Sequence, residues 1–173
     1  MMQQEGKTML VLGIDPGTAT TGFGVVKAEG SRMQAVDYGI ISTPANMDMP
    51  DRLCLIHEGL VKIIAQYQPQ MVAVEQIFYH RNAKTVITVA QSRGVVLYTA
   101  ASEGIQVYEY TPLQVKQSVV GYGQAEKRQV QMMVQRILSL KEVPKPDDAA
   151  DALAVAICHL HGHRLEQIYR SEL

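Results

Sequence analysis

The chain lacks the features that would mark it as a secreted or membrane-spanning protein. It has only two cysteines, Cys54 and Cys158, which fall inside predicted helices without metal-ligand spacing, and this favours buried free thiols. No apolar run approaches the roughly 18 residues of a membrane span. Residues 1–10 lack the basic and apolar pattern of a signal peptide. We therefore expect a cytoplasmic protein with no membrane association.

The chain also lacks a large excess of charge of either sign. The 16 Lys and Arg residues nearly balance 17 Asp and Glu, and the net charge of −1 does not by itself indicate a nucleic-acid-binding protein. If four acids are set aside as metal ligands, 13 acids remain against 16 bases, a balance of +3. The composition therefore permits a basic surface around an acidic site.

The 173 residues, 47% of them hydrophobic, are enough for one domain with a substantial core. We expect residues 1–7 to form a loose leader, residues 8–165 a single domain and residues 166–173 a short tail. The hydrophobic periodicity predicts strands over residues 8–14, 21–28, 33–42, 71–74 and 105–110, and helices over 51–67, 82–103, 125–138 and 148–161, with a short helix starting at Pro112. This order predicts an α/β fold, a mixed sheet flanked by helices.

Four carboxylates occupy positions that suit a metal-dependent nuclease. Asp15 and Glu75 end apolar runs that predict buried strands, and Asp148 and Asp151 lie three residues apart at the start of a helix. Acids at strand ends and at a helix N-terminus can converge on one point. A partly dry cluster of carboxylates repels itself unless it binds hard cations such as Mg²⁺. The pattern therefore favours metal-assisted phosphoryl transfer, in which acids hold two ions about 3.5–4 Å apart.

Each acid also has a purely structural explanation. Asp15 precedes Pro16 and Gly17 and fits an Asx-type turn. Glu75 fits a rim residue paired with a lysine. Acids are ordinary at helix starts, where the helix dipole favours negative charge, and Asp147 fits the helix cap. Asp151, however, lies among the small and apolar residues of AADALAVA, where two aligned carboxylates favour a shared cation.

Four segments, GIDPGTATTGFGVV, AVEQIF, QVKQSVVGYGQAEKRQV and DDAADALAVAICH, occur in this order within residues 8–161. Together they resemble the RuvC family of Holliday junction resolvases. The resemblance implies an RNase H-like fold with a mixed five-stranded sheet, in which a three-stranded antiparallel meander adjoins parallel strands. It implies a homodimer and a Mg²⁺-dependent endonuclease, with two ions per active site and Mn²⁺ as a substitute.

The resemblance further implies paired symmetric nicks in four-way junction DNA, leaving 5′-phosphate and 3′-hydroxyl ends that a ligase can seal. A branch-migration helicase complex of the RuvA and RuvB type is the implied partner. The family's catalytic and metal-binding acids match Asp15, Glu75, Asp148 and Asp151.

The resemblance also assigns DNA contacts. It places Phe78 in the junction, stacked on an unpaired base, whereas the alternative is a buried loop aromatic. It places Lys116 and Lys127 near the scissile phosphate, whereas the alternative is two solvated lysines. Further phosphate-binding candidates are Arg81, Lys84, Arg93 and Arg128.

The roles of the C-terminal histidines and of the 82–103 helix are less clearly indicated by the sequence. His159, His161 and His163 alternate along the sequence and do not align on a helix, so we expect a frayed, solvated helix end and no metal site. The 82–103 helix is apolar beyond one narrow stripe. Its surface either meets a symmetry mate or is buried against the sheet.

Three other functions are alternatives to a junction resolvase. Asp15-Pro16-Gly17-Thr18 resembles the phosphate loop of actin-like and sugar-kinase-like ATPases, but 173 residues are too few for the two domains that these proteins need. A nuclease acting on RNA–DNA hybrids or structured RNA would use the same carboxylate chemistry. A junction-binding protein with a degenerate site is disfavoured, because all four acids are present.

Overall fold

Five strands form one mixed sheet in the spatial order β3-β2-β1-β4-β5. The computed structural model describes residues 8–77 and 83–171. The strands are β1 Met9–Asp15, β2 Thr20–Glu29, β3 Arg32–Ser42, β4 Met71–Glu75 and β5 Gln106–Tyr110. The first three strands pair antiparallel, and β4 and β5 continue the sheet parallel to β1. The predicted meander and the predicted parallel strands are both confirmed.

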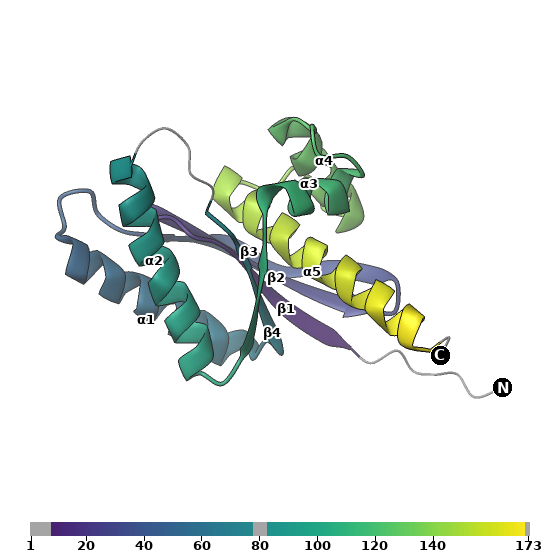
Figure 1. Ribbon diagram of the computed structural model, residues 1–173, viewed down its shortest axis with the longest axis horizontal. Helices are drawn as coiled ribbons and strands as arrows, with labels where there is room; N and C mark the ends of the chain where they lie inside the picture. The colour runs from purple at the N-terminus through teal and green to yellow at the C-terminus, as the bar shows by residue number, and fades with distance from the viewer. Residues whose placement is uncertain (1–7, 78–82, 172–173) are drawn as a thin grey trace.

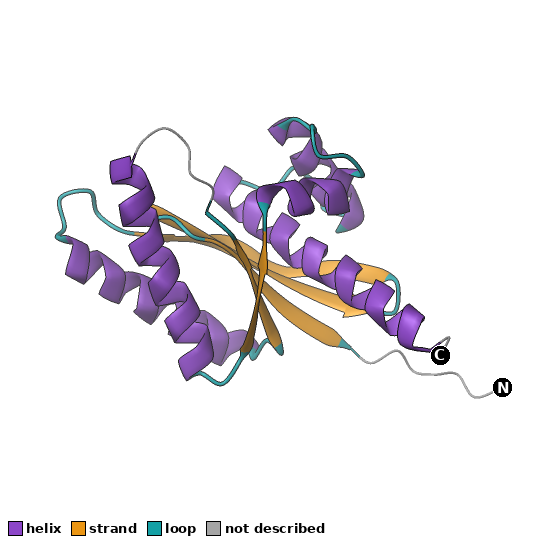
Figure 2. Cartoon of the chain, in the orientation of Figure 1, coloured by secondary structure: helices purple, strands orange, loops and turns teal. Residues whose placement is uncertain are grey.

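Helices cover both faces of this sheet (Figure 1). They are α1 Met49–Tyr67, α2 Ala83–Ser102, α3 Pro112–Val120, α4 Lys127–Ile137 and α5 Asp147–Ser171. α1 and α2 pack on one face, and α5 runs along the other face with α3 and α4 beside it. Figure 2 shows the strands between these two helical layers.

Alternation along the strands decides which side chains meet which layer. On β1, Leu12 and Ile14 belong to the core beneath α1 and α2, whereas Val11 belongs to the core beneath α5. Because side chains alternate with a period of two, Asp15 projects on the same face as Val11. On β4, Ala73 faces α5, which places Glu75 on that face as well.

α5 approaches the sheet closely because glycines replace larger residues beneath it. A Cβ on Gly13 would lie 2.1 Å from the backbone oxygen of Ala152, and a Cβ on Gly22 would lie 2.0 Å from that of Asp148. Gly22 pairs with Asp15 across β1 and β2. The start of α5 is therefore held directly over the end of β1.

The α5 helix differs most from its predicted bounds, since it begins at Asp147 and continues to Ser171. Asp147 is thus the first helical residue, not the cap, and its Oδ1 accepts a hydrogen bond from Gln131 Nε2 on α4 (3.0 Å). The predicted start of α3 is confirmed, because Thr111 and Gln114 form a reciprocal capping box.

The cysteines divide between two environments. Cys158 is buried as predicted, but Cys54 is exposed, so the prediction of two buried thiols was wrong for Cys54. Cys54 belongs to α1, whose buried positions are Ile56, Leu60, Ile63 and Ile64. Apolar side chains at the neighbouring helical positions fill the core, and Cys54 lies outside their stripe.

Candidate active site

Asp15 and Glu75 end two adjacent parallel strands. Ile14 pairs with Val74 in the β1–β4 register, so the two carboxyl groups that follow lie side by side at one edge of the sheet. They share a hydrogen bond. The apolar runs before each acid form the strands, and the parallel pairing brings the two run ends together.

α5 adds two more carboxylates from above the sheet. Asp148 and Asp151 are both half-buried in its first turns. Carboxylate oxygens of Asp15, Asp148 and Asp151 lie within 4.8 Å of one another. The structure therefore brings three of the four predicted acids into one cluster, and the fourth, Glu75, contacts it through Asp15.

The protonation of these acids reflects their burial and mutual repulsion. Burial, followed by the charges of Glu75 and Asp151, raises the pKa of Asp15 to about 9. Burial also raises the pKa of Glu75, and its hydrogen bond with Asp15 opposes this rise. At neutral pH the Asp15–Glu75 pair therefore retains a proton in the metal-free protein.

Lys127 forms ion pairs with two acids of α5. Its Nζ lies 3.2 Å from Asp151 Oδ2 and 3.4 Å from Asp147 Oδ2. Burial lowers the pKa of Lys127, but the charges of Asp151 and Asp147 outweigh this effect, so that the net change is a rise. Burial raises the pKa of Asp151, and the lysine partly opposes that rise. One ammonium thus offsets only part of the charge of the cluster.

A pocket of about 210 Å³ opens beside these groups, lined by Glu75, Asp151, Lys116 and Lys127 together with Pro112, Val115, Val130 and Ala154. Lys116 is half-buried, and its charge opposes the rise in the pKa of Glu75. Two acids and two lysines therefore line one cavity between β4, α3, α4 and α5.

The donor set fits a hard divalent cation. All three clustered ligands are carboxylate oxygens, which suit Mg²⁺ or Mn²⁺ better than soft metals. Burial, and after it the repulsion between the acids, raises the pKa of Asp15, and a cation bound in the cluster would offset both effects. The arrangement can hold a metal and can present it to a group entering the neighbouring pocket.

Comparison with known proteins agrees with this geometry. The sequence model of the family described as crossover junction endodeoxyribonuclease RuvC matches residues 11–159. The chain belongs to the RuvC family. Its RuvC relative from Syntrophomonas wolfei is 64% identical over 94% of this chain and 95% of that protein. The relative from Clostridioides difficile is 53% identical over 94% of this chain and 96% of its own length.

Solved RuvC structures agree in fold. The Thermus thermophilus RuvC structure in complex with Holliday junction substrate is 37% identical, covers 91% of this chain and 96% of that chain, and superimposes with a TM-score of 0.87. The yeast mitochondrial resolvase Ydc2 shares the fold at 13% identity, with a TM-score of 0.66 over 91% of this chain and 80% of its own. This RuvC family member is thus an RNase H-like endodeoxyribonuclease that hydrolyses DNA phosphodiester bonds, which sets the ATPase alternative aside.

The other residues that were predicted to contact DNA lie in different environments in this RuvC chain. Arg128 is exposed near the start of α4, next to Lys127. Lys84 belongs to the first turn of α2. Arg93 is not a free phosphate ligand, because it forms an ion pair with Glu109 on β5. Phe78 and Arg81 lie outside the described residues.

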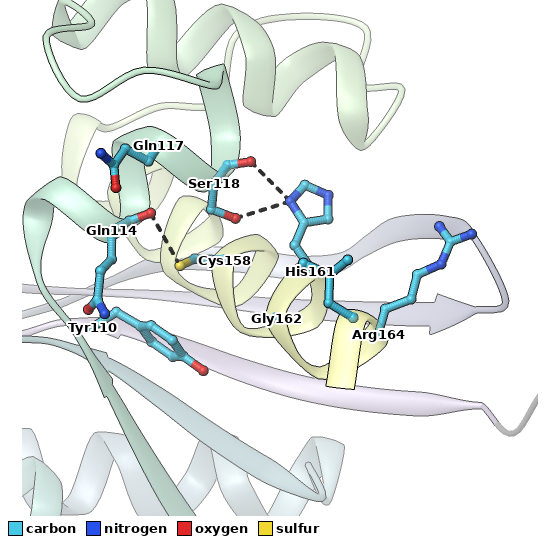
Figure 3. A pocket seen from close by; sticks show the side chains of 9 residues that line it. Tyr110, Gln114, Gln117, Ser118, Cys158, His161, Gly162 and Arg164 are labelled. Carbon is cyan, nitrogen blue, oxygen red and sulfur yellow. Dashed lines mark hydrogen bonds between the residues drawn. The ribbon is translucent and has the colours of Figure 1, made fainter. Parts of the chain in front are cut away.

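The three C-terminal histidines are not a frayed helix end, so that expectation was wrong. His159 is only 2% exposed and its Nδ1 lies 2.7 Å from the hydroxyl of Tyr110. His161 Nδ1 lies 3.1 Å from both Oγ and the backbone oxygen of Ser118 (Figure 3). The helix continues to Ser171, and packing against β5 and α3 orders these side chains.

Sequence reasoning missed two features near this site. The first is Thr20, whose hydroxyl donates to Asp148 Oδ2 at 2.7 Å, and the alternating pattern of β2 gave no signal for it. The second is a larger cavity of about 670 Å³ on the other side of α3, which Tyr110, Gln114, Cys158 and Leu165 help to line (Figure 3). Apolar residues that face a cavity cannot be distinguished in sequence from those that face a core.

Within the described residues, no helix is both long enough and apolar enough to cross a bilayer.

Proposed function

We propose that this RuvC family member resolves four-way DNA junctions by paired, symmetric, Mg²⁺-dependent nicks that leave ligatable 5′-phosphate and 3′-hydroxyl ends. The observation that carries the proposal is the convergence of Asp15, Asp148 and Asp151 within 4.8 Å, in a chain of this family. The Thermus thermophilus relative was solved with a Holliday junction substrate, which supports the same substrate class here.

In this proposal the four acids Asp15, Glu75, Asp148 and Asp151 are the catalytic and metal-binding residues. They would hold two Mg²⁺ ions, for which Mn²⁺ can substitute. Such ions, when bound, polarise the phosphate and favour ionisation of water at neutral pH. The protein's own contribution is to hold its carboxylates on a rigid strand pair and a buried helix, so that little reorganisation is needed at the moment of reaction.

The basic residues would contact the DNA at two kinds of position, at the cleavage site and along the duplex. Lys127 and Lys116 line the pocket beside Glu75 and Asp151, where they can neutralise the phosphate at the cleavage position. Arg128, Lys84 and Arg81 would contact phosphates farther along the duplex, which adds salt-sensitive affinity without sequence choice. Phe78 would stack on an unpaired base at the junction.

Two symmetric nicks require two active sites related by a two-fold axis, so we include a homodimer in the proposal. α2 supports it with an exposed apolar stripe. Ile87 and Tyr98 are 61% and 67% exposed, and Ala90 and Gly94 lie exposed between them on the same helical face. Val96, by contrast, is buried, so α2 divides its apolar residues between the core and this outer face.

The proposal extends to a branch-migration complex of the RuvA and RuvB type as partner and to the cytoplasm as the site of action. Residues 8–165 would be the nuclease domain, with residues 1–7 and 166–173 as its flanking segments.

The test is cleavage of a synthetic mobile four-way junction, with Mg²⁺ and with a chelator, alongside Asp15→Asn. Paired nicks that a ligase can seal, and that need both Mg²⁺ and Asp15, are the expected result. A linear duplex and an RNA–DNA hybrid of matched sequence serve as competing substrates. Preferred cleavage of the hybrid, or tight junction binding without nicks under any divalent metal, would contradict the proposal.

A further inference from the structure

The carboxylate of Asp148 is held by a hydroxyl from the opposite side of the site. Thr20 Oγ1, at the start of β2, donates to Asp148 Oδ2 at 2.7 Å. The two residues are 128 positions apart in the sequence, and both are half-buried. This contact joins the sheet to the first turn of α5 at the acid cluster.

Thr20 is itself fixed by its backbone. It pairs with Ser42 in the β2–β3 ladder, and its neighbour Ala19 accepts a hydrogen bond from the amide of Thr43 at 3.0 Å. Thr21 donates its hydroxyl to the carbonyl oxygen of Gly17 at 2.7 Å, which closes the turn before the strand. A hydroxyl on so constrained a backbone loses little additional freedom when it binds Asp148.

The partners of the other acids are of a different kind. Asp151 faces the ammonium of Lys127, and Asp15 forms a hydrogen bond with Glu75. A lysine competes with a metal ion for its carboxylate, because both are cations. A neutral hydroxyl donor does not compete in this way. It occupies one lone pair of the carboxylate and fixes the orientation of the group.

We propose that Thr20 is a positioning residue that orients the Asp148 carboxylate for the divalent cation. The inference rests on the proposed function only in taking Asp148 as a metal ligand. Partners that orient a ligating carboxylate commonly contribute about 10–100-fold to metal affinity or activity. In this proposal Thr20 acts through Asp148 and is not itself a metal ligand.

The experiment compares Thr20→Val, which deletes the hydroxyl at nearly constant shape, with Thr20→Ser, which restores it. Thr8→Val is the matched control, since Thr8 precedes the opposite end of β1 from Asp15. The primary readout is Mn²⁺ and Mg²⁺ binding to the DNA-free protein by titration calorimetry. The second readout is the Mg²⁺ concentration that gives half-maximal junction cleavage.

We expect Thr20→Val to weaken metal binding by about tenfold or more, and Thr20→Ser and Thr8→Val to bind within about twofold of the wild type. Thr20→Ala provides a second deletion of the hydroxyl if valine impairs folding. Wild-type metal affinity in both deletions would overturn the proposal, even if their melting temperature in chelator fell, because that result assigns the contact to stability alone. Wild-type protein that binds metal but leaves junctions intact would instead overturn the proposed function, and the affinity comparison would still test Thr20.

Discussion

Gly22 and Asp148 are in contact across the sheet–helix interface so closely that a Cβ on Gly22 would lie 2.0 Å from the backbone oxygen of Asp148. No side chain fits in this space. Because Gly22 also pairs with Asp15, the same glycine lets strand and helix acids approach one another. The geometry of the proposed metal site thus depends on a residue that has no side chain of its own.

We predict that Gly22→Ala displaces the start of α5 and lowers junction cleavage by about 100-fold, since displacements near 1 Å can have effects of that size. Loss of cleavage should accompany weaker metal binding, whereas junction binding should persist. Gly162→Ala is the control, because a Cβ at that helical position meets nothing within 4 Å. Cleavage by Gly22→Ala at the wild-type rate would show that α5 can shift without consequence.

The raised pKa of Asp15 predicts how stability depends on pH without metal. Its carboxyl ionises near 3.8 when unfolded and near 9 when folded, so the folded state binds the extra proton between these values. The contribution of Asp15 to the free energy of unfolding is therefore most favourable below pH 3.8, where the carboxyl is protonated in both states. This contribution is lost as the pH rises toward 9. We expect Asp15→Asn in chelator to raise the melting temperature at pH 8, by about 2–4 °C for each kcal/mol recovered, and to flatten the pH profile. Parallel profiles of the two proteins by calorimetry would contradict this assignment.

Lys127 should affect metal binding and cleavage in opposite directions. Its ammonium lies 3.2 Å from Asp151 Oδ2, where it competes with a metal for that carboxylate. We predict that Lys127→Met binds Mn²⁺ at least as tightly as the wild type, yet cleaves junctions about 10-fold or more slowly because a charge facing the phosphate is lost. Lys141→Met, at an exposed position, is the matched control. Equal losses of metal affinity and rate would mean that Lys127 supports the acid cluster itself.

The Tyr110–His159 hydrogen bond should contribute to stability. His159 is buried, and burial followed by the charge of His163 lowers its pKa to about 4, so Nδ1 of its neutral ring needs a hydrogen-bond partner. We predict that Tyr110→Phe lowers the free energy of unfolding by about 1–3 kcal/mol, the usual effect of leaving a buried polar atom unsatisfied. Tyr122→Phe, in an exposed loop, should change it little. Chemical denaturation at pH 7 measures both, and equal effects would contradict a specific role for the bond.

Dimer formation can be tested at Gly94, on the exposed stripe of α2. A Cβ there meets nothing within 4 Å, so Gly94→Arg should preserve the fold of the protomer. We predict a shift to monomer in sedimentation velocity and loss of paired nicks, because a large charged side chain prevents close helix approach. Gly162→Arg makes the same change at an open position of α5 and should remain dimeric. A dimeric Gly94→Arg protein would place the interface elsewhere.

The sequence by itself determined which elements form and where the four acids lie on them. Alternation and apolar runs placed strands that end at Asp15 and Glu75, and i,i+3 spacing placed Asp148 and Asp151 on one helical face. Local periodicity carries this information because each element must turn its apolar residues toward the core. The family was indicated separately, by the resemblance of four ordered segments to the RuvC family.

Only the tertiary structure decided which groups meet. The Thr20–Asp148 contact spans 128 positions, and no local pattern encodes a pairing at that separation. Similarly, His159 is buried and Cys54 is exposed because of which face of each helix the neighbouring elements cover. Sequence periodicity defines a face, but the packing of sheet against helix determines what that face touches.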